Sequence, residues 1–76
     1  MKLIILRTDI KTKKKVKKMA SIFNQHNEII SWSVDTEDID NVLRIESTDQ
    51  LFDEDIIQLV SKEGFYAEDL PEYLFV

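Results

Sequence analysis

The spacing of apolar residues along this chain changes several times, and each change marks a predicted element. Residues 2–7 (KLIILR) are rich in β-forming side chains at both parities, which predicts a strand covered on at least one face. A polar loop follows. From residue 13 the apolar positions recur every three or four residues, at Val16, Met19, Ala20 and Phe23. This spacing predicts a helix with one buried stripe, capped by Thr12 or Asp9.

The middle of the chain alternates between apolar and polar residues, as strands with one covered face do. In 28–35 the alternation places Ile30, Trp32 and Val34 on one face, and 42–47 alternates in the same way. The residues between these two segments are polar and turn-forming. Two alternating strands with a short polar connection predict an antiparallel hairpin.

The last third of the chain contains a second helix with signals at both of its ends. Acidic residues begin the segment 53–64, Lys62 lies in its last turn, and Gly64 follows where a left-handed residue is needed. The segment 65–70 (FYAEDL) then predicts a final strand, which Pro71 ends.

The element order β-α-β-β-α-β is typical of a ferredoxin-like sandwich. This α+β fold has a four-stranded antiparallel sheet with both helices on one face. A chain of 76 residues has room for one such core, so 1–76 is predicted to be a single domain with 71–76 as its C-terminal tail. We expect the apolar tail to pack over a sheet edge, whereas an exposed tail would favour dimerisation.

The composition excludes several classes of chemistry. The chain has no cysteine, which excludes disulfides, thiolate metal sites and thiol catalysis. His26 is the one histidine and has no neighbouring nucleophile, so we expect no enzyme and no cofactor. The aliphatic run LIIL near the start is too short for a signal peptide or a membrane span. We therefore expect a cytoplasmic protein without membrane insertion.

The charges are distributed very unevenly over a chain whose net charge is −5. Residues 1–24 contain eight basic residues and one acidic residue, whereas 25–76 contain two basic and fourteen acidic residues. Such an acidic chain does not favour nucleic-acid binding, and 42–47 has no aromatic residue with which a ferredoxin-like sheet could stack RNA bases.

Six of the eight lysines form what we call the lysine cluster: Lys11, Lys13, Lys14, Lys15, Lys17 and Lys18. The ordinary interpretation is a solvated helix face. However, positive charge in the first turn opposes the helix dipole, and together with free backbone N–H groups it makes an anion-binding surface.

The order and spacing of these segments resemble the heavy-metal-associated domain of copper chaperones and metal-transporting ATPases. The resemblance covers about residues 2–70 and is carried by LIILRTDI, the helix beginning near Lys13, the hairpin IISWSVDTEDIDNVLRIES and the closing EGFYAEDL. It implies a Cys-x-x-Cys metal site between the first strand and the first helix. In this chain the pair falls on Thr12 and Lys15, which are not soft ligands for copper or zinc.

We therefore expect a non-enzymatic interaction or regulatory module with a degenerate metal site. The lysine cluster is predicted to bind an acidic partner protein or a second copy of the chain. The ammonium group of Lys15 could also mimic the charge of a bound metal ion. The alternative is a heavy-metal binding or transport-related protein that keeps weak affinity for copper or zinc through hard ligands. The stretch 35–40 (DTEDID) lacks the glycine and glutamate of a calcium loop, so we expect no calcium site there.

Overall fold

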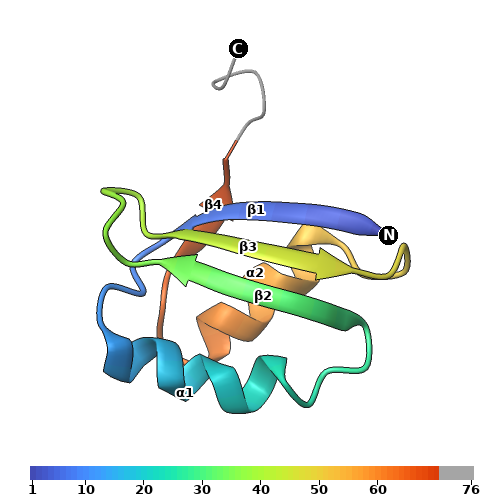
Figure 1. Ribbon diagram of the computed structural model, residues 1–76, viewed down its shortest axis with the longest axis horizontal. Coiled ribbons are helices and arrows are strands. Elements are labelled where there is room, and N and C mark those ends of the chain that lie inside the picture. Colours follow the sequence, from blue (N-terminus) through green and yellow to red (C-terminus); the bar gives the residue numbers. More distant parts are fainter. Residues whose placement is uncertain (71–76) are drawn as a thin grey trace.

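The computed structural model describes residues 1–70, so the predicted tail 71–76 and its packing lie outside the described residues. The described chain forms six elements: β1 (Lys2–Thr8), α1 (Lys13–Phe23), β2 (Ile29–Asp35), β3 (Val42–Ser47), α2 (Asp53–Lys62) and β4 (Ala67–Asp69). The strands form an antiparallel sheet in the order β2-β3-β1-β4, and both helices cover one face of it (Figure 1). The predicted ferredoxin-like α+β fold is confirmed.

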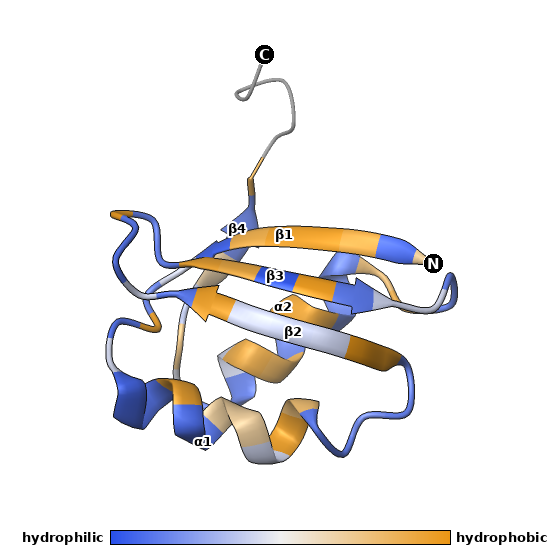
Figure 2. Ribbon diagram, viewed as in Figure 1, coloured by the Kyte–Doolittle hydropathy of each residue, from blue (hydrophilic) through white to orange (hydrophobic). Residues whose placement is uncertain are grey.

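The core lies between the sheet and the two helices. Alternate residues of the central strands point toward the helices, and the register of β1 on β3 pairs Ile4 with Ile45 and Leu6 with Leu43. The helices contribute the stripes that their spacing predicts, with Met19, Phe23, Ile56 and Val60 fully buried. Figure 2 shows the same division, because apolar residues concentrate on the central strands and hydrophilic residues on the first turns of α1.

The alternation predicted for β2 is wrong at one residue. A β-bulge lies between Ile29 and Ser31, and Ile30 is 58% exposed instead of facing the core. A bulge adds one residue to a strand and so shifts the alternation of side chains before it. Ile29 takes the inward place, next to Trp32 and Val34, which pack against the core as predicted.

The C-terminal end of α2 forms a Schellman motif. Gly64 has the left-handed φ of +85°, its N–H donates to the carbonyl of Ser61 (3.0 Å), and the N–H of Phe65 donates to the carbonyl of Val60 (3.2 Å). The last strand is therefore shorter than predicted and begins at Ala67, because Phe65 belongs to the helix end. Neither helix of the described residues is long and apolar enough to span a membrane.

Candidate interaction surface

The first turn of α1 carries the two positions that the resemblance assigns to the metal pair. Thr12 has an extended backbone and caps the helix, and its hydroxyl accepts a hydrogen bond from the N–H of Lys15 (3.2 Å). Thr12 and Lys15 therefore lie within one turn, directly after the loop that follows β1. Asp9, the other predicted cap, instead accepts a hydrogen bond from the N–H of Tyr66 (2.7 Å) and so ties this loop to the segment before β4.

The chemistry of this turn differs from that of a soft-metal site. The Thr12 hydroxyl is engaged as a helix cap, and Lys15 is a cation without acceptor atoms. Within residues 1–70 there is no group of three or more His, Cys, Asp or Glu residues placed to hold a metal ion. The Nδ1 atom of His26 accepts a hydrogen bond from the N–H of Glu28 (3.1 Å), so this nitrogen serves a loop turn.

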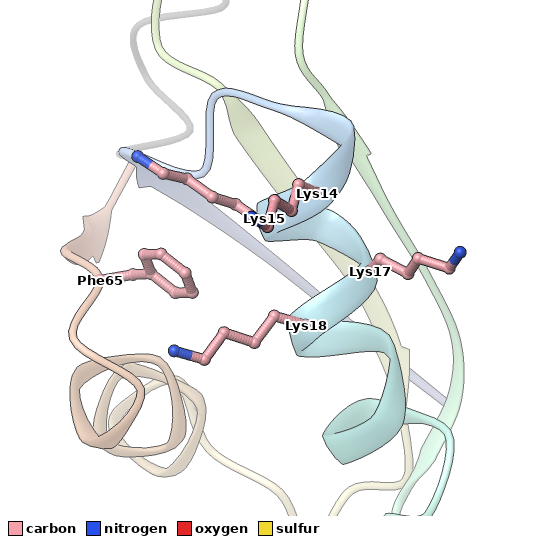
Figure 3. Close-up of a pocket in the computed structure, with 5 residues that line it drawn as sticks. All are labelled: Lys14, Lys15, Lys17, Lys18 and Phe65. Carbon is pink, nitrogen blue, oxygen red and sulfur yellow. The ribbon is translucent and has the colours of Figure 1, made fainter.

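Part of the lysine cluster lines an open groove beside α1. We call it the lysine groove; it has a volume of about 610 Å³ and is lined by Lys14, Lys15, Lys17, Lys18 and Phe65. In Figure 3 the side chains of Lys15 and Lys18 extend on either side of the Phe65 ring, whereas the ammonium group of Lys17 points away from it. The Nζ atoms of Lys15 and Lys18 lie 5.9 and 5.5 Å from the ring centroid, within the range of cation–π attraction.

Phe65 reaches the groove because of the way α2 ends. The Schellman motif at Gly64 reverses the chain and directs the next residue back toward α1. The half-buried ring packs against the edge of the core, and Lys18 Nζ also donates to the carbonyl of Glu63 at 3.5 Å. The residue pattern of 65–70 predicted Phe65 in a strand and did not indicate its place in this surface. The available signal was a glycine at a helix end followed directly by an aromatic residue.

The structure thus separates the six lysines into two sets. Lys14, Lys15, Lys17 and Lys18 line the groove, whereas Lys11 and Lys13 are exposed outside it. That any of the six lysines binds a partner remains a prediction.

An acidic site lies where the start of α2 meets the end of β4. The hydrogen bond between the carboxyl groups of Asp53 and Asp69 is the largest of the effects that raise the pKa of Asp69 to about 6. Desolvation of the carboxyl group and the negative charges of Asp53 and Glu54 act in the same direction. The chain therefore separates a region of crowded positive charge from a region of crowded negative charge.

Comparisons with known proteins find the same fold in two solved structures. No family model matches the sequence, and no curated protein matches it. A solved structure described under "Crosstalk between Cu(I) and Zn(II) homeostasis" is similar with a TM-score of 0.78 and 11% identity, over 92% of this chain and 100% of that chain. The "CsoZ metallochaperone" is similar with a TM-score of 0.74 and 13% identity, over 88% of this chain and 96% of that chain. At such identity the likeness shows a shared fold, which confirms the fold that the resemblance implied.

Proposed function

We propose that this chain is a non-enzymatic protein-interaction module, built on a metallochaperone-like fold, that binds an acidic partner at the lysine groove. The observation that carries the proposal is the position of Lys15. It lies in the first turn of α1, where the heavy-metal-associated family holds a metal ligand, and its ammonium group lies over Phe65 in the groove. In this proposal, the permanent positive charge of Lys15 replaces the charge that a bound metal ion brings to this part of the fold in that family.

The electrostatics of the groove support an acidic partner. Lys14, Lys15 and Lys18 place three ammonium groups on one side of α1 near its N-terminus. These groups repel one another, and the helix dipole also disfavours positive charge at this end. Carboxylates of a partner would relieve this repulsion, and the attraction would weaken as salt screens exposed charges.

The groove also offers an apolar contact. The Phe65 ring and the aliphatic stems of the flanking lysines form its floor, and aromatic residues are enriched at protein interfaces. The fitting partner therefore combines carboxylates with an apolar side chain. We place this interaction in the cytoplasm, which cell fractionation would check.

The test is a titration of ¹⁵N-labelled protein with a synthetic peptide of alternating Glu and Leu, followed by NMR chemical shifts. Lys15→Glu/Lys18→Glu should weaken binding at least about tenfold, because two attractive charges become repulsive at the contact. Lys15→Glu keeps the helix start intact, because Thr12 and a glutamate three residues later form a capping box.

The matched control is Lys11→Glu/Lys13→Glu, which makes the same change in net charge in the same segment but outside the groove. It should change the affinity by no more than about threefold, an effect of overall charge alone. Equal weakening by the two double variants would reject the groove as the binding site.

A further inference from the structure

The loop between β2 and β3 presents an apolar side chain among carboxylates. Ile39 is 94% exposed and lies between Asp38 and Asp40, and Glu37 precedes them. Isolated exposed apolar residues are common on protein surfaces. The order of acidic, apolar and acidic residues at the tip of this loop is therefore the more informative feature.

Hydrogen bonds within the loop hold Ile39 in its exposed position. A carboxylate oxygen of Asp35 accepts from the N–H groups of Glu37 (3.1 Å) and Asp38 (3.3 Å). A carboxylate oxygen of Asp38 in turn accepts from the N–H of Asp40 (2.8 Å). A loop that is already ordered loses less conformational entropy when it binds.

The loop and the first turns of α1, which carry the lysines of the groove, lie at the same end of the molecule (Figure 1). The N–H of Thr8 donates to the carbonyl of Asp40 (3.0 Å), which fixes the loop beside the end of β1. The next residue, Asp9, donates its N–H to the carbonyl of Tyr66 (3.3 Å), and Tyr66 follows Phe65 of the groove. Ile39 nevertheless remains almost fully exposed, so the loop does not fill the groove of its own chain.

The two features are complementary in charge and in the placement of their apolar groups. The groove has an aromatic ring between the ammonium groups of Lys15 and Lys18. The loop has Glu37 and Asp38 directly before Ile39, whereas the carboxylate of Asp40, after Ile39, pairs with Arg7 of its own chain (3.1 Å). An apolar side chain set on the ring would place the carboxylates of Glu37 and Asp38 near the ammonium groups of the groove.

We propose that the protein self-associates by inserting the 36–41 loop of one copy into the lysine groove of a second copy. This inference rests on the proposed function of the groove and names its partner. Because loop and groove lie at one end of the molecule, two copies related by a twofold axis can exchange both contacts. The result is a closed dimer, since each copy then uses both of its complementary features.

The association is expected to be weak and dependent on salt. Each copy has a net charge of −5, so two copies repel one another at a distance, and the attraction is confined to the small contact. Analytical ultracentrifugation at protein concentrations from about 10 µM to about 1 mM covers the dissociation constants expected for such a small interface. The dimer should be populated at about 50 mM NaCl and reduced at about 500 mM NaCl.

Substitutions on either side of the contact should weaken the dimer. Ile39→Ser should raise the dissociation constant about tenfold or more, because it removes the apolar side chain that the ring would cover. Lys15→Glu/Lys18→Glu and Glu37→Lys should each raise it by a similar factor, whereas Glu46→Lys, on the exposed sheet surface, should leave it within about threefold.

A mixture of two variants gives the sharpest readout. Mixing Glu37→Lys with Lys15→Glu/Lys18→Glu should restore dimers, because the mutant loop now fits the mutant groove and the other contact is native in both halves. Failure of the mixture to associate, or a wild-type protein that stays monomeric at low salt, would overturn this inference. If the acidic peptide still binds the groove in either case, the proposed function stands without self-association.

Discussion

Thr12 illustrates how one residue can serve the fold at a position where the heavy-metal-associated family, which this chain resembles, has a metal ligand. Its hydroxyl accepts the N–H of Lys15, one of the four N–H groups that the start of any helix leaves without an intrahelical partner. The start of α1 needs this acceptor, because its first turn contains no acidic residue and three lysines oppose the dipole.

Replacing Thr12 should therefore reduce stability. Thr12→Ala is expected to lower the free energy of unfolding by about 1 kcal/mol, the usual effect of losing a side-chain cap. Thr12→Ser keeps the hydroxyl and should stay within about 0.5 kcal/mol of the wild type. Urea unfolding followed by circular dichroism measures both variants. Equal losses for alanine and serine would show that the threonine methyl group, and not the cap, stabilises the helix.

At the scale of elements, the meeting of α2 and β4 combines a favourable arrangement with an unfavourable one. Asp53, Glu54 and Asp55 suit the N-terminus of α2, where the dipole favours negative charge. The end of β4 brings Asp69 against Asp53, however, and this contact raises the pKa of Asp69. The backbone position of Asp69 is fixed by the sheet register, in which Asp69 pairs with Leu6.

This contact predicts a specific pH dependence. The pKa of Asp69 is about 6 in the folded chain and ordinarily 3.8, so between these values the folded state binds more protons than the unfolded state. The contribution of Asp69 to stability is therefore present at low pH and is lost as the pH rises from about 4 to about 6. Asp69→Asn should remove this decrease of the free energy of unfolding with pH, and it should make the protein more stable than the wild type at neutral pH.

Urea unfolding at about pH 4.5 and about pH 7 gives the change in the free energy of unfolding with pH, which we call the pH slope, for the wild type and for Asp69→Asn. The control is Asp49→Asn, which replaces an exposed carboxyl group that pairs with the N-terminal amine (3.5 Å). This variant should keep the pH slope of the wild type. If Asp69→Asn also kept it, the carboxyl pair would have no effect on folding.

At the scale of the whole molecule, the fold and the chemistry of its surface are separable. The chain shares its fold with two solved structures at 11% and 13% identity, one of them the CsoZ metallochaperone. It contains no cysteine. Thr12 and Lys15 lie in one turn directly after β1, at the two positions that the resemblance assigns to the metal pair.

Restoring the ligands should restore metal binding. Thr12→Cys/Lys15→Cys is expected to bind monovalent copper and zinc, because thiolates suit both ions and the helix N-terminus and nearby lysines lower thiol pKa values. The wild type should not bind either ion tightly. Competition with a chromophoric chelator measures both proteins. Tight binding by the wild type would favour the alternative of a metal-binding protein. A double variant that binds neither ion would show that the geometry of this loop does not suit a metal site.

The sequence by itself determined the features that depend on neighbours along the chain. Apolar spacing predicted the order of the six elements, Thr12 was among the predicted caps, and Gly64 marked the end of α2. These features follow from backbone preferences and from hydrogen bonds over a few residues, so local sequence is sufficient to predict them.

Only the tertiary structure decided what depends on contacts between distant segments. It placed Phe65 between Lys15 and Lys18, turned Ile30 outward at a bulge, and set Asp69 against Asp53. Each of these results depends on strand register or on the reversal of the chain after α2, which position two segments that are far apart in sequence. The lysines could be read from the sequence, but the groove that they line exists because the end of α2 packs beside α1.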